Sequence, residues 1–499
     1  MPLSMWINGE FVASSSDGKI EVLNPYTEQV LGAVPAGTPA DVERAVGAAQ
    51  AAFADWRSIP AVERADFLHE IARKLREKEE PLARQLTLEG GKPLVENLDE
   101  VGWTAACFDY YAEIGRHSRG RVIPSIESSQ LSLVLKEPYG VVGCIVPWNY
   151  PLLLMAWKVA PALAAGNTVV LKPSSVTPLS TLMLAEAFDH LPPGTVNIVT
   201  GSGEQVGDAL VTHPRVPVIA FTGSTTVGQR IARLAGPMMK KLHLELGGKD
   251  AFIVAEDADL DVAVPGVAWA ALLNNGQVCT STERIYVHYS LYNELTSLIA
   301  EYVAGLVLGD PLDPTTDLGP MARERYRAKV EHQVADAVQR GARVLTGGRR
   351  PQDLPTGYFF EPTVLIGIDR EMALMCEETF GPVLPIGRFE TFERKAWTSS
   401  ERPSTSIGTL TWSQRGGGTP TNATIKSDRC ASPCSSPFGG SLARQRLTGR
   451  RPHHENGRNP DGSHQRGVPP VACCSPQNQN GNLVGLLLQA DWETHDFLQ

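Results

Sequence analysis

The sequence lacks a long uninterrupted hydrophobic run. A helix that spans a bilayer needs about 20 consecutive apolar residues. An uncharged apolar segment covers 139–157, but Pro147, Asn149 and Pro151 interrupt it, and proline breaks a helix interior. We therefore expect no membrane among the partners of this chain.

Neither cysteine nor positive charge is abundant. The eight cysteines are scattered over 499 residues, unlike the regular spacings of a small disulfide-bonded scaffold. The formal net charge of −10 argues against a protein that coats nucleic acid or a membrane surface. Residues 1–11 also lack the basic and apolar segments of a secretion signal. We expect a cytoplasmic protein with reduced thiols and no nucleic-acid partner.

Short apolar runs separated by helical stretches are present between 140 and 228. The runs VVGCIV, NTVVLK, TVNIVT and VPVIAFTG each have the length of a buried strand. Their alternation with helices predicts a parallel sheet with crossover helices, and hence an α/β fold. Earlier in the chain, residues 6–22 alternate apolar and polar residues around Asn8-Gly9 and Asp17-Gly18, which predicts a hairpin, and Thr38-Pro39 predicts the start of a helix.

Cys279 lies between a turn signal, NNGQ, and a strand-like run, IYV. A cysteine attacks as the thiolate, which requires partial exposure, a cation or helix N-terminus nearby, and a group that accepts protons. A lone cysteine is more often a small buried hydrophobic residue. We interpret Cys279 as a candidate nucleophile on a loop between a buried helix and a strand.

Glu245 ends an alternating segment, KLHLE, directly before the glycines of LELGGK. The pattern places its carboxylate at the end of a short strand beside a tight turn. A buried carboxyl at such a place can have its pKa raised into the working range of a general base. We therefore predict a buried Glu245 that serves as the base for Cys279.

Together, LELGGK and GQVCTSTERIYV resemble the aldehyde dehydrogenase superfamily, with Glu245 and Cys279 about 34 residues apart. The resemblance covers about residues 5–393 and has features of the betaine-aldehyde/aminoaldehyde and lactaldehyde-type branches. It implies that Glu245 is the general base and Cys279 the nucleophile. The implied reaction is the oxidation of an aldehyde to the carboxylic acid with NAD or NADP, through a thiohemiacetal and a thioester.

The resemblance also implies an aldehyde dehydrogenase-like α/β architecture. A Rossmann-type cofactor-binding domain would comprise 1–120 and 140–245. Residues 121–139 would be the oligomerisation arm, which joins subunits into a homodimer or homotetramer. An incomplete α/β catalytic domain would cover 246–393.

Asn149, in the motif PWNYP, is the candidate oxyanion donor. When a thiolate adds to a carbonyl carbon, the oxygen becomes negative, and a preorganised donor there contributes about 3–4 kcal/mol. The Asn149 amide and the Cys279 backbone N–H could supply this pair. The alternative is an asparagine that only caps the following helix.

Cofactor contacts follow from the resemblance as well. The implied residues are Trp148, Lys172, Ser174, Ser175, Gly203, Gly223, Ser224, Gly228, Leu246, Glu378 and Phe380. GSGEQVG and FTGSTTVG taken singly could be ordinary turns between strand and helix. FTGST, about 20 residues before LELGGK, resembles the family's pyrophosphate turn, where backbone amides and a helix N-terminus meet the cofactor. Lys172 would reach the adenosine ribose, Glu378 the nicotinamide ribose, and Phe380 the nicotinamide.

Ser175 bears on the choice between NAD and NADP. NAD-preferring members carry a glutamate three residues after the ribose lysine, which repels a 2′-phosphate. Here that position holds Ser175, a neutral hydroxyl that can donate to phosphate, three residues after Lys172. We expect NADP to be accepted beside NAD. The alternative is that Ser175 caps the helix entered at Thr177-Pro178.

Tyr150 and Trp157 are the candidate substrate-pocket residues. They resemble aromatic residues that surround a cationic group in the aminoaldehyde branch through cation–π contact, although aromatics at helical spacing are more often core. Gly102 and Trp103 stand about where aminoaldehyde enzymes place carboxylates, which departs from that branch. No arginine precedes Cys279 in AWAALLNNGQ, which argues against an anionic substrate.

From 394 to 499 the chain is rich in Ser, Pro, Gly, Arg, Asn and Gln, without a sustained helical or strand period. Such a composition builds no core, so we expect a disordered tail. Only PFGG at 437–440 matches the family's late pattern. A shifted reading frame and an authentic divergent tail both remain open. Because part of the family's scaffold would be missing, a non-catalytic cofactor-binding remnant is the alternative to an active enzyme.

The tail also contains residue types that bind zinc or nucleic acid. They are Cys430, Cys434, His453, His454, Cys473 and Cys474, and the basic group Arg444, Arg446, Arg450 and Arg451. The spacing of the first set matches no compact zinc knuckle, and no aromatic residues interleave the second. We predict neither a metal site nor a nucleic-acid site.

Overall fold

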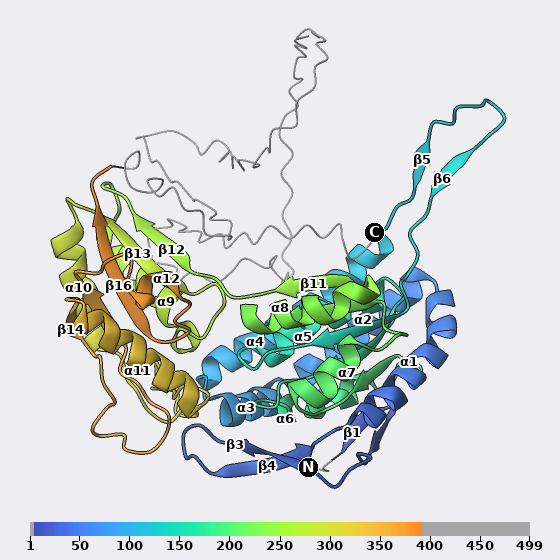
Figure 1. Cartoon of the computed structure of the whole chain (residues 1–499), viewed down its shortest axis with the longest axis horizontal. Helices are drawn as coiled ribbons and strands as arrows, with labels where there is room; N and C mark the ends of the chain where they lie inside the picture. The colour runs from blue at the N-terminus through green and yellow to red at the C-terminus, as the bar shows by residue number, and fades with distance from the viewer. Residues whose placement is uncertain (1–3, 392–499) are drawn as a thin grey trace, which may run out of the picture. The chain divides into compact units, whose positions relative to one another are not determined.

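The computed structural model describes residues 4–391, which form two large sheets and two small hairpins (Figure 1). The predicted tail, with its candidate zinc and basic residues, lies outside the described residues. Within residues 4–391 no helix is both long and apolar enough to cross a membrane.

The first sheet contains the predicted parallel strands. They are β7 (Val141–Ile145), β8 (Thr168–Lys172), β9 (Val196–Ile198), β10 (Val218–Thr222) and β11 (Lys241–Glu245). With β1 (Met5–Ile7) and β2 (Glu10–Val12), the order is β11-β10-β7-β8-β9-β1-β2. The hairpin predicted at Asn8-Gly9 joins β1 and β2, and β1 pairs with β9 antiparallel. The α/β expectation is confirmed.

Both faces of the first sheet are buried. Val142 and Cys144 of β7 belong to one hydrophobic core, and Val141 and Ile145 belong to the other. This alternation explains the continuous apolar run of β7, because a parallel strand covered on both faces has no polar side. The helices in the part of the chain that forms this sheet are α1 (Pro39–Ser58), α2 (Ala61–Glu77), α3 (Glu79–Gly90), α4 (Leu94–Arg116), α5 (Pro151–Ala164), α6 (Leu179–Leu184), η1 (Ala185–Phe188), η2 (Gly203–Gly207), α7 (Asp208–Val211), α8 (Thr225–Ala235) and η3 (Gly236–Met238).

The predicted helix start at Thr38-Pro39 is confirmed, because Pro39 is the first residue of α1. Thr38 and Asp41 form a capping box, in which the Asp41 side chain accepts from the Thr38 backbone N–H at 2.9 Å. Pro at the first helical position fits, since its missing N–H has no intrahelical partner there.

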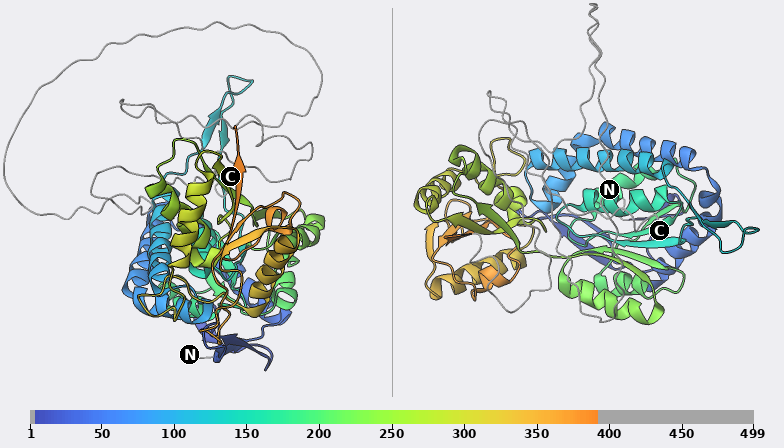
Figure 2. Two further views of the ribbon diagram at one scale, coloured as in Figure 1. Left: turned by 90° about the vertical axis from the view of Figure 1, so that its left-hand side faces the viewer. Right: turned by 90° about the horizontal axis from the view of Figure 1, so that it is seen from above.

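The second sheet has the order β12-β13-β16-β15-β14. Its strands are β12 (Asp250–Val254), β13 (Thr282–His288), β14 (Arg343–Thr346), β15 (Thr363–Ile366) and β16 (Val383–Phe389). Its helices are α9 (Leu260–Leu272), η4 (Leu273–Gly276), α10 (Tyr292–Ala304), α11 (Glu324–Gln339) and α12 (Ala373–Cys376). One core joins this sheet to α9 and α10, and another joins it to α11, so that helices cover both faces (Figure 2, right).

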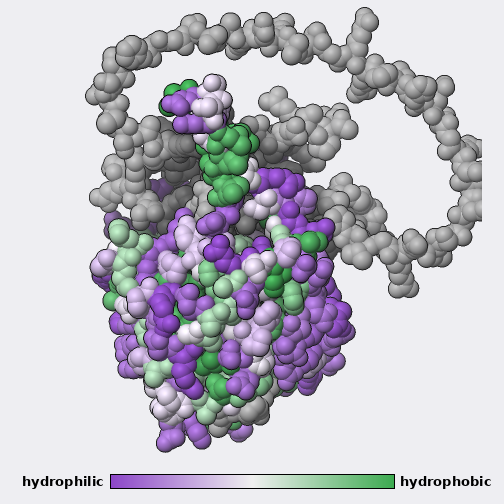
Figure 3. All heavy atoms as spheres, turned by 90° about the vertical axis from the view of Figure 1, so that its right-hand side faces the viewer, coloured by the Kyte–Doolittle hydropathy of each residue, from purple (hydrophilic) through white to green (hydrophobic). Residues whose placement is uncertain are grey.

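Two hairpins lie outside these sheets: β3 (Lys19–Leu23) with β4 (Val30–Pro35), and β5 (Arg121–Ile123) with β6 (Ser132–Val134). The second falls in the segment expected to be the oligomerisation arm. Its large apolar side chains are exposed: Val122, Ile123, Ile126, Leu131, Leu133, Val134 and Leu135. Hydrophobic residues gather on this hairpin in Figure 3. An apolar surface of this kind is typical of a protein interface.

Candidate active site

Cys279 is half-buried and lies on the predicted loop, between η4 and β13. The turn before it is tight, because Asn274, Asn275 and Gly276 all have left-handed φ values of 48°, 57° and 68°. Asparagine and glycine tolerate this region better than other residues. A Cβ atom on Gly276 would lie 2.3 Å from the carbonyl oxygen of Gly381, so only glycine fits there.

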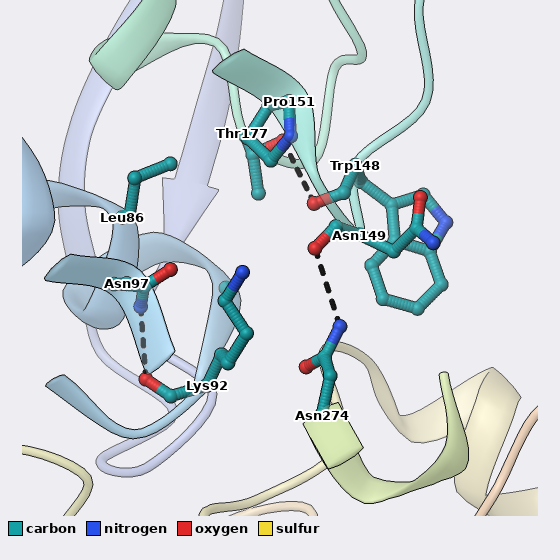
Figure 4. A pocket seen from close by; sticks show the side chains of 9 residues that line it. Leu86, Lys92, Asn97, Trp148, Asn149, Pro151, Thr177 and Asn274 are labelled. Carbon is teal, nitrogen blue, oxygen red and sulfur yellow. Dashed lines mark hydrogen bonds between the residues drawn. The ribbon is translucent and has the colours of Figure 1, made fainter. Parts of the chain in front are cut away.

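Asn149 is joined directly to this loop. Its Nδ2 donates to the carbonyl oxygen of Gln277 at 3.0 Å. In turn, Asn274 Nδ2 donates to the carbonyl oxygen of Asn149 at 3.2 Å (Figure 4). A primary amide has two N–H donors. The second N–H of Asn149 can therefore serve a ligand held beside the cysteine loop.

The alternative that Asn149 only caps α5 is wrong. The cap comes from Glu100 on α4, whose Oε1 accepts from the backbone N–H groups of Leu152 at 3.0 Å and Leu153 at 3.3 Å. A carboxylate at this end of a helix is also favoured by the helix dipole. The Asn149 side chain therefore bonds to the loop of Cys279 and not to the start of α5.

A cavity of about 10 Å³ lies beside Asn149, with Lys92, Trp148 and Asn274 among its lining residues (Figure 4). This volume fits one water molecule but no aldehyde. Lys92 pairs with buried Glu100 and lies 3.7 Å from the centre of the Tyr150 ring. One face of Tyr150 is therefore occupied by a cation of the chain itself.

Two consequences follow for the predicted substrate pocket. Tyr150 is buried, and a substrate cation could use only the ring face away from Lys92. Trp157 is half-buried on α5. The aromatic enclosure of a substrate cation stays a prediction that depends mainly on Trp157.

Glu245 is exposed, so the prediction of a buried carboxyl is wrong. It ends β11 as predicted, but β11 is the edge strand of the first sheet and pairs only with β10 within residues 4–391. An edge strand has a neighbouring strand on one side only, so a residue at its end has fewer residues around it than one inside the sheet. The carbonyl oxygen of Glu245 accepts from the Gly223 N–H at 3.1 Å, which ties β11 to the predicted pyrophosphate turn.

The electrostatic surroundings of Cys279 are negative. Burial, followed by the charges of Glu245, Glu378 and Asp250, raises the pKa of the thiol to about 11. The free protein therefore holds Cys279 as the protonated thiol at neutral pH. Activation requires a change in this field or a base that removes the proton during attack.

Lys158 is a charged residue near the site that sequence reasoning missed. It is buried on α5 and donates a hydrogen bond to Thr222. Burial lowers the pKa of Lys158 to about 8, although the charges of Cys144, Glu245 and Cys279 oppose this shift. A signal was present in the sequence, because Lys158 is the one charge within the apolar stretch PLLLMAWKVAPALAAG.

The start of α8 has the features of an anion site. Ser224 is its N-cap, whose Oγ accepts from the Val227 N–H at 3.4 Å, and the first turn is exposed. The first N–H groups of a helix have no intrahelical partner and bind anions such as phosphate. A Cβ on Gly228 would lie 2.5 Å from Leu246, so this glycine lets Leu246 pack against α8. These residues fit the pyrophosphate of a dinucleotide.

Lys172 is the last residue of β8, and Ser175 lies in the turn that follows. Lys172 is buried, which lowers its pKa to about 8, and its Nζ donates to the carbonyl oxygen of Pro173 at 3.0 Å. Ser175 is exposed and does not cap α6, so that alternative is wrong. Glu89 supplies the cap instead, since its carboxylate accepts from the N–H groups of Leu179 and Ser180 at 2.8 and 2.9 Å.

Ser174 and Gly203 are two further residues that were predicted to contact the cofactor. Ser174 Oγ accepts from the Val176 N–H at 3.1 Å, which shapes the turn after β8. Gly203 is exposed at the start of η2, and a Cβ there would meet no atom within 4 Å. The described residues therefore do not require glycine at position 203.

Trp148, Glu378 and Phe380 gather near the catalytic segments. The Trp148 ring stands edge-on to Phe380 with ring centres 5.6 Å apart. The Glu378 carboxylate lies against Gly247, where a Cβ would come within 2.7 Å of it. Glu378 is thus held beside the segment of Glu245. Within residues 4–391 no cluster of three or more His, Cys, Asp or Glu side chains could hold a metal ion.

Residues 11–396 match the sequence profile of the aldehyde dehydrogenase family. The chain belongs to this family. Among curated aldehyde dehydrogenases, aminoaldehyde dehydrogenase 2, peroxisomal, of Pisum sativum is 41% identical over 399 residues, which cover 78% of this chain and 79% of the relative. The lactaldehyde dehydrogenase of Escherichia coli (strain K12) is 39% identical over 392 residues, covering 78% and 81%.

Solved structures of aldehyde dehydrogenase relatives agree. A structure titled as an E. coli NADP dependent enzyme has a TM-score of 0.76 at 39% identity, covering 78% of this chain and 81% of that chain. The NAD+ complex of an aldehyde dehydrogenase from Bacillus cereus has a TM-score of 0.77 at 37% identity, covering 79% and 80%. The predicted family and its aminoaldehyde and lactaldehyde relatives are confirmed. The roles of single residues stay predictions.

Proposed function

We propose that this aldehyde dehydrogenase oxidises a small aldehyde to the carboxylic acid with NAD or NADP. One observation carries the proposal: the Asn149 amide is hydrogen-bonded to the carbonyl of Gln277, two residues before Cys279. This contact holds a candidate oxyanion donor against the loop that carries the candidate nucleophile. The NADP dependence stated for the E. coli relative and the NAD+ bound to the B. cereus relative support the choice of cofactor.

The reaction would use three side chains of the chain. Cys279 Sγ attacks the carbonyl carbon as the thiolate after the thiol proton passes to solvent, and the new oxyanion is held by Asn149 Nδ2 and the Cys279 N–H. The oxidised nicotinamide, when bound, accepts the hydride of the aldehyde carbon. Glu245 then removes a proton from water, the water attacks the thioester, and the C–S bond breaks to release the acid and the thiol.

A second candidate is a cofactor-binding remnant without turnover. It is favoured by the exposure of Glu245 and by the end of the family match at residue 396. The test incubates the full chain with NAD or NADP and with an aminoaldehyde, betaine aldehyde or lactaldehyde. Equal amounts of acid and reduced nicotinamide support the enzyme. Calorimetric binding of the cofactor without product supports the remnant and overturns the enzyme.

The cofactor choice gives a separate prediction. Wild type is expected to use NADP with a kcat/KM within about tenfold of that for NAD, because exposed Ser175 does not repel a 2′-phosphate. Ser175→Glu should lower kcat/KM for NADP by about tenfold or more while changing NAD little, since one carboxylate opposes the phosphate. Ser297→Glu, which introduces the same charge at an exposed serine on α10, is the control and should change neither value. Equal rejection of NADP by wild type and Ser175→Glu would contradict the assignment.

We also propose that β5 and β6 join two copies of the chain. The apolar side chains of this hairpin are exposed in the single chain, which favours burial against a second copy. Light scattering should give a dimer or tetramer for wild type and for Val62→Asp, an exposed control on α2. Leu133→Asp should shift the mass toward the monomer. A monomeric wild type would contradict this proposal.

The expected cytoplasmic location also stays a proposal. The pea relative is named as a peroxisomal protein. Cell fractionation of the tagged full chain would distinguish the two compartments.

A further inference from the structure

The loop that carries Glu378 and Phe380 has a backbone conformation that side chains disfavour. Phe380 has a φ of 57°, in the left-handed region, where an aromatic residue is uncommon. Such a residue persists only where its surroundings hold it, and these places concentrate at functional sites. The contacts that hold Phe380 therefore bear on how the site works.

Glu283 supplies those contacts. Its Oε1 accepts from the backbone N–H of Phe380 at 2.8 Å, and its Oε2 accepts from the N–H of Thr379 at 2.9 Å. Glu283 is 4% exposed. Its carboxylate oxygens accept hydrogen bonds from a loop that is about a hundred residues away in sequence. Two charge-assisted hydrogen bonds to consecutive amides fix the orientation of the peptide between them.

Lys249 completes the group. Its Nζ lies 2.7 Å from Glu283 Oε2 and donates to Thr379 Oγ1 at 3.0 Å. A buried carboxylate without a counter-charge is strongly unfavourable, and Lys249 provides that charge. Lys249 follows Glu245 by four residues, and Glu283 follows Cys279 by four residues. The pair therefore joins the segment of the base, the segment of the nucleophile and the loop of Phe380.

We propose that the Lys249–Glu283 ion pair positions Glu378 and Phe380 for the nicotinamide half of the cofactor. This inference rests on the proposed function, because it assigns the pair to the same site. Lys249 and Glu283 act through the loop and are positioning residues. The Glu283 carboxylate bonds to the backbone amides of a loop. It takes no part in the backbone pairing of β13 with β16, so the second sheet does not need these contacts in order to form.

The geometry separates the two halves of the cofactor. The candidate adenosine contact, Lys172, ends β8 of the first sheet, and the candidate pyrophosphate contact, Ser224, follows β10 of that sheet. The Glu283 contacts lie at the loop before β16. Loss of Glu283 should therefore affect the nicotinamide half and spare the adenosine half. ADP-ribose, which lacks the nicotinamide ring, is the matching probe.

The experiment measures calorimetric affinities of the full chain for NAD and for ADP-ribose. Glu283→Ala should weaken NAD binding by about tenfold or more, because two charge-assisted hydrogen bonds are lost. ADP-ribose binding should stay within about twofold, as expected for a distant site. Glu283→Gln should show a smaller loss, since its carboxamide oxygen still accepts from the loop. Glu331→Gln, which breaks the exposed pair with Arg350, is the control and should change neither affinity.

Hydrogen exchange of the loop gives a second readout that needs no cofactor. In Glu283→Ala the amides of Thr379 and Phe380 should exchange about tenfold faster or more, while those of the Glu331→Gln control stay as in wild type.

Three results would overturn the inference. NAD affinity that is unchanged in Glu283→Ala shows that the pair does not position the nicotinamide site. Equal losses for NAD and ADP-ribose in both Glu283 variants show that the pair only maintains the fold. A wild type that binds neither ligand refutes the proposed function first, and the inference with it. A selective loss of NAD together with faster exchange at Phe380 supports it.

Discussion

Cys279→Ala is expected to lose aldehyde oxidation by about 10⁴-fold or more in kcat, because no other side chain can form the covalent intermediate. Cofactor binding should remain, since the candidate pyrophosphate turn lies at the start of α8 and makes no use of the thiol. Turnover is followed by the formation of reduced nicotinamide, and binding by calorimetry. Turnover that survives in Cys279→Ala would refute the assignment of the nucleophile.

A matched cysteine control is available. Cys376 is exposed, and its Sγ donates to the carbonyl oxygen of Arg370 at 2.8 Å. Cys376→Ala should keep the wild-type kcat, because this thiol lies on α12 and belongs to none of the catalytic segments. A large loss in Cys376→Ala would show that the effect of cysteine removal is not specific to Cys279.

The reactivity of the Cys279 thiol should depend on pH in a way that tests its assignment as the nucleophile. Burial and the neighbouring carboxylates raise the pKa of the Cys279 thiol to about 11. Below that pKa the thiolate fraction grows about tenfold per pH unit, so alkylation of the cofactor-free protein should accelerate with rising pH through 8 and 9. Mass spectrometry of the Cys279 peptide measures the rate. A plateau below pH 8 would indicate a thiolate that is already formed.

The elements that the sequence predicts well depend on short windows. The strands β7, β8 and β10 are mainly apolar and five residues long, and their length and the turn signals beside them identify them without tertiary information. The loop of Cys279 follows from its turn and strand signals in the same way. These signals are local, so these elements could be located before their neighbours in space were known.

The contacts of the site depend on residues that no short window contains. Asn149 and Gln277 are 128 residues apart, and Glu283 and Phe380 are 97 apart. A cap by Asn149 was a reasonable alternative within the window, and the actual cap, Glu100, lies 52 residues before its partner Leu152. Such pairs are determined by the packing of helices on sheets, which sequence spacing does not encode.

The prediction that Glu245 is buried was wrong for a related reason. Alternation along KLHLE identifies β11 correctly, but it does not say whether the strand lies inside the sheet or at its edge. The order of strands in a sheet is decided by long-range pairing. At the edge, the end of β11 is open to solvent within the described residues, and so is the carboxylate of Glu245.

The exposure of Glu245 determines what its substitution should do. Glu245→Gln should lower steady-state turnover by about 10²–10⁴-fold, because the amide cannot take a proton from the water that hydrolyses the thioester. The substitution preserves size and polarity at an exposed strand end, so the fold should be unaffected. Glu331→Gln, at a half-buried carboxylate on α11 that pairs with Arg350, is the control and should keep wild-type turnover.

The decisive measurement separates attack from hydrolysis. If Glu245 acts mainly on water, Glu245→Gln should still release about one equivalent of reduced nicotinamide per chain in the first turnover. Mass spectrometry should then find the acyl group on the Cys279 peptide, and this adduct should be absent from the control. A first turnover slowed as much as the steady state, without an adduct, would assign Glu245 to the activation of the thiol instead. Hydrolysis is the expected step, because an exposed carboxylate has water beside it and the thiol is half-buried.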